Sequence, residues 1–291
     1  MAVAVSARRQ VVSPAPRAEW ERILRSDPEA LVTQSPAWTD AMARVGYEDV
    51  SRRYALPSGC RAVVSLVRRR SVHPAALAPR HSAPPAWGMG GAVSDGPLSA
   101  EDLRWIVADL ASQPALSVRI RPNPLHAEAW SVARAHGAVA LPRLAHVIDL
   151  EGGPDAAWRR LSRSARWGVR KAQRSGVRIE CAAGARLLPI YCRLLELSIE
   201  RWARTQHEPL AAPCHANDLL LWTAMEEARA AGCRRYHLGE SGVARSVAHF
   251  KERFGARAVP YAEYRFERLP LARADALARA SVRRALRFRD A

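Results

Sequence analysis

From residue 99 to residue 266, helical and extended patterns alternate along the sequence, and this alternation constrains the fold most strongly. Apolar residues at three- and four-residue spacing predict helices at 99–112, 125–136, 186–201, 218–230 and 244–254. Short runs rich in branched and aromatic residues predict strands at 116–121, 145–150, 177–181, 235–238 and 258–266. Strands mixed with helices, without a repeat of solenoid length, predict layered α/β architecture with mixed sheets.

The first hundred residues add two short helices and a strand pair. The helices are predicted at 18–26 and 37–45, the second capped by Ser35 with Pro36 in its first turn. Strands at 50–56 and 61–69 are expected to turn at 57–59. The glycine-dense stretch at 84–91 predicts a close backbone approach or a bulge, and no Lys-Ser/Thr follows it as in a phosphate loop.

The segment 158–176 is the most basic part of the chain. From residue 159 to residue 178 it carries seven arginines, one lysine and no carboxylate. On one helix, a stripe of guanidinium groups would be formed by Arg159, Arg163, Arg166, Arg170 and Arg174. A neighbouring stripe suited to burial would be formed by Trp158, Leu161, Ala165, Gly168 and Ala172. Like charges four residues apart oppose a helix by roughly 0.2–0.5 kcal/mol per pair, so the stripe indicates an anionic partner. A solvated arginine face is the alternative.

The charge of the whole chain also favours a polyanionic partner. Its 291 residues carry a net charge of +17, and the sequence pI is about 11.0. Of the 45 basic residues only Lys171 and Lys251 are lysines, so these two mark places where a compact ammonium is wanted, or fall there by chance. The arginine excess itself reflects genome composition rather than chemistry.

Cysteine usage and the N-terminus indicate no further class of protein. The five cysteines are odd in number and form no C-x-x-C pair, which predicts neither a disulfide framework nor a metal site. Residues 1–16 are too short and too interrupted for a signal peptide or a membrane span. We therefore expect a cytoplasmic monomer without a membrane span. The Pro-Gly stretch at 151–154 predicts a boundary between domains at 1–150 and 151–267, followed by an Arg-rich C-terminal helix in 268–291 that packs back on the first domain.

Several short motifs resemble the FemXAB family. They are QSPAW at 34–38, HVIDL at 146–150, RWGVRKA at 166–172, SGV at 175–177 and FKERFG at 250–255. The motifs follow the family's order over about residues 18–266, and the R-x-x-x-R-K-A and F-K-x-x-F-G pair is the most specific. The resemblance implies two tandem GNAT-like domains and transfer of an acyl group to an amine. Its best-known members use aminoacyl-tRNA, and other members and GNAT relatives use acyl-CoA.

The resemblance also suggests roles for individual residues. Lys251 resembles the family's lysine at the tRNA 3′ end and is the predicted catalytic residue, the alternative being a surface helix lysine. Predicted phosphate or tRNA contacts are Arg163, Arg166, Arg170 and Lys171, and predicted donor-site neighbours are Gly239, Ser241 and Phe250. The residues themselves offer three proton acceptors near the second motif, His237, Glu240 and His249. No Ser-His-Asp order or Cys-His pair supports a covalent intermediate.

Two departures from the family pattern keep alternatives open. The segment 204–217 is much shorter than the family's usual connection, so the second domain is expected to be abbreviated. His237 stands where the family often has an acidic residue. We predict an aminoacyltransferase that joins an amino acid from aminoacyl-tRNA to an amine of a small peptide or cell-wall-type precursor, without a cofactor. The alternatives are an acyl-CoA-dependent N-acyltransferase and a non-catalytic RNA-binding remnant.

Overall fold

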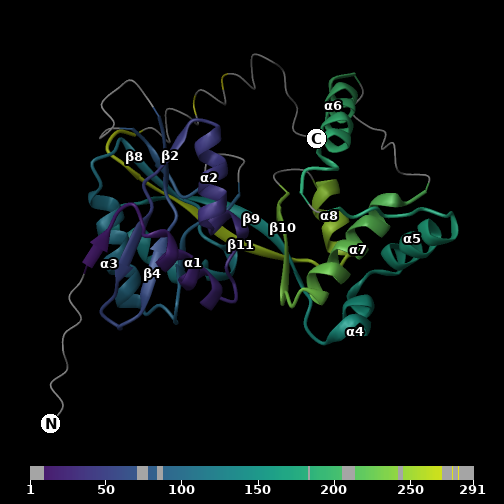
Figure 1. Cartoon of the computed structure of the whole chain (residues 1–291), viewed down its shortest axis with the longest axis horizontal. Coiled ribbons are helices and arrows are strands. Elements are labelled where there is room, and N and C mark those ends of the chain that lie inside the picture. Colours follow the sequence, from purple (N-terminus) through teal and green to yellow (C-terminus); the bar gives the residue numbers. More distant parts are fainter. Residues whose placement is uncertain are drawn as a thin grey trace, which may run out of the picture. The chain divides into compact units, whose positions relative to one another are not determined.

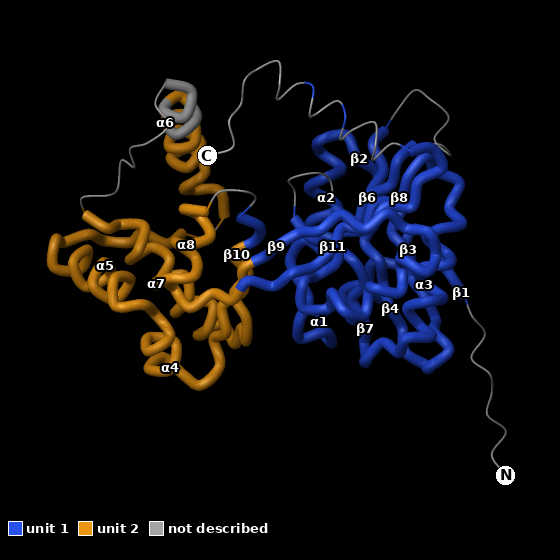
Figure 2. The backbone as a smooth tube through the Cα atoms, turned by 180° about the vertical axis from the view of Figure 1, so that it is seen from behind, with its two compact units in different colours: residues 1–145, 239–244, 258–291 blue, residues 146–238, 245–257 orange. Residues whose placement is uncertain are grey.

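The chain forms two compact units, distinguished by colour in Figure 2. The computed structural model describes residues 10–70, 78–83, 88–182, 184–204, 214–241 and 245–270, and the single positions 277 and 281. Unit 1 comprises Met1–Ala145, Gly239–Ala244 and Ala258–Ala291. Unit 2 comprises His146–Leu238 and Arg245–Arg257.

Helices and strands are mixed throughout the chain, as the sequence predicts (Figure 1). The strands are β1 (Gln10–Val12), β2 (Tyr47–Asp49), β3 (Arg52–Ala55), β4 (Arg61–Val64), β5 (Val67–Arg69), β6 (Arg80–His81), β7 (Ala92–Ser94), β8 (Ser117–Ile120), β9 (Val139–Asp149), β10 (Arg235–Glu240) and β11 (Arg257–Glu267). The α-helices are α1 (Arg17–Ser26), α2 (Pro36–Arg44), α3 (Ala100–Ser112), α4 (Gly153–Arg160), α5 (Arg163–Arg174), α6 (Leu188–Arg204), α7 (Ala216–Ala230) and α8 (Arg245–Arg253). Three 3-10 helices are η1 (Val32–Gln34), η2 (Pro124–His126) and η3 (Ala129–His136).

A four-stranded sheet of unit 1 runs in the order β1-β3-β4-β7. β3 and β4 pair antiparallel with Arg52 opposite Val64, so the predicted strand pair turning at 57–59 is confirmed. Successive residues of a strand face opposite sides. Val63 packs on one side with Trp20 and Ile23 of α1, whereas Val64 enters the main core on the other side.

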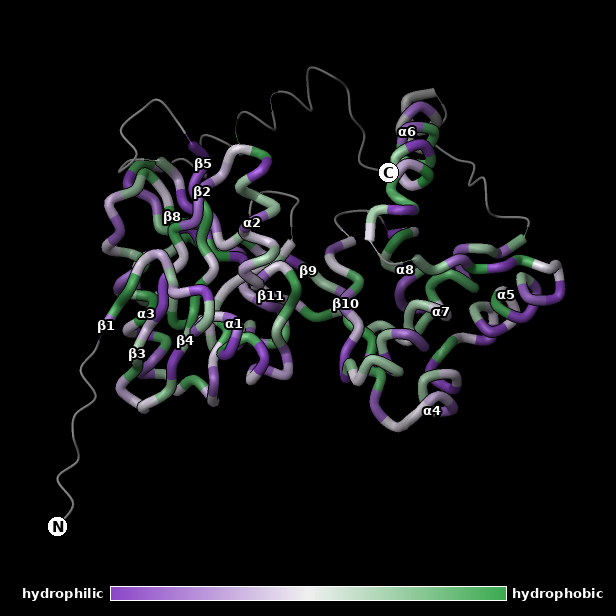
Figure 3. The backbone as a smooth tube through the Cα atoms, viewed as in Figure 1, coloured by the Kyte–Doolittle hydropathy of each residue, from purple (hydrophilic) through white to green (hydrophobic). Residues whose placement is uncertain are grey.

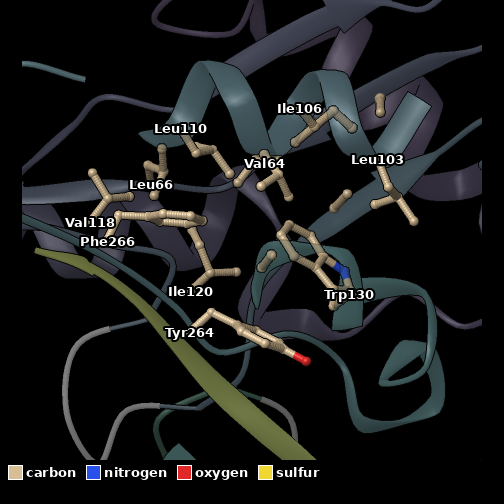
Figure 4. Close-up of a cluster of buried hydrophobic side chains, with 14 of the residues drawn as sticks. Val64, Leu66, Leu103, Ile106, Leu110, Val118, Ile120, Trp130, Tyr264 and Phe266 are labelled. Atoms are coloured by element: carbon tan, nitrogen blue, oxygen red, sulfur yellow. The ribbon is translucent and has the colours of Figure 1, made fainter. Parts of the chain in front are cut away.

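The main core of unit 1 lies between this sheet, α3 and strands β8 and β11 (Figure 4). Ser99 caps α3 by accepting a hydrogen bond from the N–H of Asp102 at 3.1 Å, and the Asp102 carboxylate accepts one from the N–H of Ser99 at 2.9 Å. The core then receives Leu103, Ile106 and Leu110 from α3, Val118 and Ile120 from β8, and Tyr264 and Phe266 from β11.

The other sheet runs in the order β10-β9-β11-β8-β6-β5-β2. In β11 the residues that face the core alternate with charged residues, which lie on the opposite face of the sheet. Buried Glu263 is one of these charged residues and binds several arginines. Its carboxylate binds Arg121 at 2.9 Å, Arg143 at 3.0 Å and Arg265 at 2.6 Å. Burial opposes ionisation of Glu263, but hydrogen bonds from Arg121 and Arg265 prevail and hold its pKa at about 2.

The close backbone approach predicted at 84–91 is confirmed at Gly90. A Cβ placed on Gly90 would lie 2.6 Å from the Ser82 carbonyl oxygen. The N–H of Gly90 donates to the Arg121 carbonyl at 2.6 Å. Only glycine allows this approach without displacing the neighbouring chain. The residues 84–87 of the same stretch lie outside the described part.

Unit 2 has its own apolar core, to which α4, α5, α7 and α8 contribute. Its buried members are Ile148, Leu150, Ala157, Leu161, Ala165, Val169, Ala172, Leu219, Trp222, Met225, Phe254 and Ala256. Strands enter unit 2 only as the end of β9, most of β10 and the first residue of β11, within the described residues. α6 differs from its neighbours because Leu188, Ile190, Tyr191 and Leu194 are all exposed, and Figure 3 shows hydrophobic positions along it.

Three predicted elements differ from the structure. The basic segment forms two helices, because Ser162 caps a second helix after α4. The predicted strand at 177–181 is wrong, since these residues adopt no regular structure and β10 ends the sheet without them. The predicted helix at 125–136 is replaced by the 3-10 helices η2 and η3.

The compact units also differ from the predicted domains. The division falls between Ala145 and His146, inside β9, rather than after residue 150. Residues 239–244 and 258–267 belong to unit 1 rather than to the second domain. The reason is strand pairing, because β11 pairs antiparallel with β8, placing Tyr264 opposite Ile120. The predicted C-terminal helix in 268–291 lies almost wholly outside the described residues.

Candidate functional site

Helix α5 carries the predicted phosphate-binding residues, and Ser162 determines where it begins. The Ser162 hydroxyl accepts a hydrogen bond from the N–H of Ala165 at 3.1 Å. The N–H of Ser162 donates to the Arg253 carbonyl at 2.7 Å, which ties the start of α5 to the end of α8. A serine cap typically contributes about 1 kcal/mol. Because the helix is interrupted between Arg160 and Arg163, Arg159 belongs to α4 and is not part of the arginine stripe on α5.

The buried face of α5 allows a very close approach to α7. Ala165, Val169 and Ala172 are fully buried on it. Gly168 lies between them, and a Cβ at Gly168 would overlap Oδ2 of Asp218 and lie 2.8 Å from its Cγ. The absence of a side chain at Gly168 is therefore what lets α5 and α7 pack at this separation.

A buried carboxylate joins α5, α7 and α8 at this contact. Asp218 is 4% exposed, and its Oδ2 lies 2.9 Å from Nδ1 of His215. The same oxygen lies 3.5 Å from Nη2 of Arg253, whose Nε donates to the Ser164 hydroxyl at 3.0 Å. His215 adopts a left-handed backbone with φ of 56°. A buried carboxylate needs such partners, so this network fixes the relative placement of the three helices.

The outer side of α5 and the adjoining part of α4 form an open pocket of about 300 Å³. It is lined by Trp158, Arg163, Arg166, Trp167, Arg170 and Arg174. Four of the six lining residues are arginines, and none is acidic. Within the described residues, no carboxylate lies at ion-pair distance from these four guanidinium groups. We call this the α5 pocket. Four neighbouring cations without a counterion among the described residues favour an anionic ligand.

Two tryptophans hold cations beside the α5 pocket. The guanidinium carbon of Arg170 lies 5.4 Å from the ring centroid of Trp158. Nζ of Lys171 lies 4.9 Å from the ring centroid of Trp167, which is 49% exposed. Both distances lie within the range of cation–π contacts, so the rings position these side chains. Arg163, Arg166 and Arg170 thus line the α5 pocket, Lys171 lies over one of its tryptophans, and the binding role of these four residues stays a prediction.

Lys251 is buried on α8 rather than exposed on a helix surface. It is 7% exposed, which contradicts the surface-lysine alternative. Its carbonyl accepts hydrogen bonds from the N–H groups of Phe254 at 3.0 Å and Ala256 at 3.3 Å, where the helix ends. Phe254 is fully buried, and Phe250 meets it with ring centroids 5.3 Å apart. A lysine is seldom fully buried unless its charge is paired.

The ammonium of Lys251 acts electrostatically on His146 of β9. The imidazole of His146 is fully buried, with Nε2 at 3.8 Å from Oε1 of Glu252. Burial and the nearby charge of Lys251 lower the pKa of His146, while Glu252 opposes the shift. His146 is therefore neutral at physiological pH and stands beside a buried cation.

The alternative proton acceptors are less well placed. His237 is half-buried on β10, burial lowers its pKa to about 4, and neither ring nitrogen has a hydrogen-bond partner within the described residues. A group with that pKa is a weak base. The Glu240 carboxylate accepts a hydrogen bond from the hydroxyl of Tyr261 and lies 3.6 Å from the guanidinium of Arg143. The side chain of His249 is exposed.

The predicted donor-site neighbours are divided between the two units. Gly239 and Ser241 belong to unit 1, whereas Phe250 belongs to unit 2. Gly239 has φ of 68°, a conformation that glycine adopts readily, and Ser241 is buried. The structure brings Phe250 to Lys251 on one helix, and their role at a donor site remains a prediction.

Several residues of the site escaped the sequence analysis as functional groups. His215 and Asp218 gave no signal, because their pairing depends on how α5 packs on α7. His146 stood within a resembling motif, but its burial beside Lys251 depends on tertiary structure. The indoles of Trp158 and Trp167 could have been noticed, since aromatic residues within a basic stretch are typical of nucleic-acid-binding surfaces.

The described part of the chain has neither a cluster of metal-ligand side chains nor a helix suited to a membrane span. Within the described residues, no three His, Cys, Asp or Glu side chains gather as metal ligands would. In the same part of the chain, no helix is both long and apolar enough to cross a bilayer.

These features define a mixed α/β protein of two compact units with a strongly cationic pocket in the second. The sequence matches no known family model and no curated protein. The fold is similar to that of a solved structure titled "Crystal structure of FemX", with a TM-score of 0.58. The match covers 89% of this chain and 97% of that chain at 11% sequence identity. The chain therefore has a FemX-like two-domain fold.

The α5 pocket predicts a selective effect of Arg166→Ala. Loss of one charge-assisted hydrogen bond costs roughly 1.5–3 kcal/mol, so affinity for a phosphate-bearing ligand should fall about ten- to a hundredfold. Fluorescence anisotropy with labelled tRNA would measure it. Arg178→Ala is the matched control, since Arg178 is exposed but does not line the pocket. Equal affinities of both variants and the wild type would contradict a role for Arg166.

Proposed function

We propose that the chain is an aminoacyl-tRNA-dependent aminoacyltransferase that forms an amide bond on an amine of a small peptide or cell-wall-type precursor. The main support is the α5 pocket, with four arginines and no acidic lining residue, in a chain of net charge +17. Its FemX-like fold adds support, since the structure it resembles is titled FemX. An RNA donor supplies the phosphates that such a pocket attracts.

The proposed reaction is aminolysis of an ester. The neutral amine of the acceptor attacks the carbonyl carbon of the aminoacyl ester, and a C–N bond forms. The C–O bond to the terminal ribose then breaks, the ribose oxygen gains a proton, and the amine nitrogen loses one. The ester is already activated, so holding both reactants in place supplies much of the rate acceleration.

We assign to Lys251 the role of stabilising the negative charge that develops on the carbonyl oxygen. As the amine attacks, the carbonyl oxygen becomes anionic, and a fixed cation at hydrogen-bond distance stabilises it. Burial of Lys251 beside neutral His146 supports this role, because a charge is more effective where water is excluded. His146 is then a positioning residue that provides an uncharged neighbour.

Product analysis tests the proposed function directly. The full chain is incubated with a mixture of charged tRNAs and candidate amines, and the products are identified by mass spectrometry. An amide product that requires charged tRNA and disappears after ribonuclease treatment is expected. The proposal fails if RNA is bound but no donor yields an amide, which would instead indicate a non-catalytic RNA-binding protein. That alternative is motivated by the segment 204–217, which is much shorter than the corresponding connection of the FemXAB family.

An acyl-CoA donor is the second candidate, because the phosphates of CoA would suit the same guanidinium groups. Thermal stabilisation by CoA, together with amide formation that resists ribonuclease, would favour it. Thermal stabilisation by charged tRNA alone would exclude it.

Binding of RNA through the α5 pocket predicts a steep dependence on salt. Neutralisation of four to six phosphates should give a slope of log affinity against log salt concentration of roughly −3 to −5. Anisotropy titrations at several salt concentrations would measure the slope, and Arg174→Ala should make it shallower by about 0.7–0.9. A flat dependence would mean that the charge serves solubility alone.

A further inference from the structure

The α5 pocket contains more than a phosphate site requires. Guanidinium groups alone suffice for phosphates, yet two of its six lining residues are tryptophans. Half of the Trp167 surface remains exposed. An exposed indole does not contribute the stabilisation that its burial would give the fold. Aromatic side chains on a basic surface are the usual stacking platform for unpaired bases.

The geometry of the pocket suits a planar ring. The Arg170 guanidinium carbon lies over the ring of Trp158, and the Lys171 ammonium lies over the ring of Trp167. Trp158 is in turn held edge-on by Trp222, with ring centroids 4.8 Å apart, so its orientation is fixed by the core of unit 2. A guanidinium plane and an indole face can both stack on a nucleobase.

The size and charges of the pocket indicate how much ligand it accepts. A volume of about 300 Å³ lies at the lower end of ligand pockets, which suits a single nucleotide. Arg163 and Arg174 stand at opposite ends of α5, eleven positions apart, about 16 Å along a helix. Both line the pocket, and their long side chains can reach inward to the phosphates on either side of a base seated between them. Paired bases are stacked inside a helix and offer no free face, so the ligand is unpaired.

We propose that the α5 pocket binds one unpaired nucleotide of an RNA, with its base on the Trp and Arg170 surfaces and its flanking phosphates on the outer arginines. The choice of RNA as the source rests on the proposed function. The same chemistry is offered by a free nucleoside diphosphate, and the experiment distinguishes the two sources.

The test compares two probes that carry the same phosphates. One is a fluorescein-labelled eight-nucleotide single-stranded RNA of mixed sequence, and the other is the same backbone without bases. The full chain should bind the base-bearing probe about five- to a hundredfold more tightly, the effect of stacking one base. Equal affinity for both probes would overturn the proposal and leave the pocket as a phosphate site only.

Single substitutions identify the side chain on which the bound base stacks. Trp167→Leu should lose most of the preference for the base-bearing probe while its affinity for the abasic probe and its salt slope stay unchanged. Trp167→Phe should keep much of the preference, because it retains an aromatic face. Tyr191→Ala is the matched control, since Tyr191 is an exposed aromatic residue of unit 2 outside the pocket. If Trp167→Leu retained the full preference, the base would bind elsewhere and the proposal would fail.

A competition arm separates RNA from a free nucleotide. Uridine diphosphate should not displace the RNA probe at concentrations near the dissociation constant of the probe. Displacement at such concentrations would assign the pocket to a free nucleotide and overturn the RNA proposal. Amide formation is measured in parallel with charged tRNA. Product formation with no base preference would refute the nucleotide site alone, whereas base preference without product would refute the proposed function alone.

Discussion

Gly168→Ala should lower the free energy of unfolding by about 2 kcal/mol, although alanine is the better helix former. Replacing glycine within a helix gains about 0.5–1 kcal/mol of backbone propensity. Overpacking of a buried contact costs about 1–3 kcal/mol and sometimes more. The added Cβ would overlap Oδ2 of Asp218, which cannot move freely because His215 and Arg253 hold it in a buried position. Steric cost therefore outweighs the gain in propensity.

Urea unfolding monitored by circular dichroism would measure this effect as a shift in the midpoint. Gln173→Ala is the control in the same helix, since Gln173 is exposed and should tolerate alanine. A double-mutant cycle with Asp218→Ala isolates the contact. Once the carboxylate is removed, Gly168→Ala should become neutral or stabilising by up to about 1 kcal/mol. Additive effects of the two substitutions would mean that the Gly168–Asp218 contact does not limit helix packing.

Local patterns predicted the parts of the fold that local interactions determine. Ser35 and Ser99 were expected to cap helices, and each side-chain oxygen accepts a hydrogen bond from a backbone N–H three residues on. The strand pair turning at 57–59 follows from a short loop between two β-rich runs. The apolar stripe of the basic segment was identified in large part, since Leu161, Ala165, Gly168 and Ala172 are buried, whereas Trp158 is half-buried and lines the α5 pocket.

Other features depend on contacts that sequence patterns do not show. Ser162 interrupts the basic segment because its side chain and backbone find partners in Ala165 and Arg253, the latter far along the chain. Residues 177–181 have strand-like composition, but a strand requires a hydrogen-bonded neighbour, and the sheet ends at β10. The division between the units likewise follows the pairing of β11 with β8, which joins segments more than a hundred residues apart.

The same distinction applies to the candidate site. The spacing of Arg163, Arg166, Arg170 and Arg174 was sufficient to place them on one face. The lack of carboxylate partners for them, within the described residues, could not be foreseen, because any acid of the chain could have folded against them. The burial of Lys251 was also unforeseen, since its position on a short helix is compatible with either solvent or core.

Lys251→Ala should reduce turnover of the proposed reaction by on the order of a hundredfold, about 2.7 kcal/mol of transition-state stabilisation. A charge that acts on the developing oxyanion contributes little to binding of the ground state, so the affinity for charged tRNA should change much less. Lys251→Arg should restore only part of the rate, because a planar guanidinium presents its hydrogens in a different geometry. Steady-state kinetics with saturating donor and acceptor would measure the wild type and both variants.

A second readout shows whether the ammonium occupies the predicted environment. Burial and the Lys251 charge both lower the pKa of His146, so removing the charge should raise that pKa. Lys251→Met, which keeps an apolar chain of similar length, avoids a cavity, and an NMR titration of the His146 ring would follow the shift. Wild-type turnover in Lys251→Met with a raised His146 pKa would remove Lys251 from the chemical step while confirming its place beside His146. Lost turnover with the same shift and intact tRNA affinity would place its charge in the transition state.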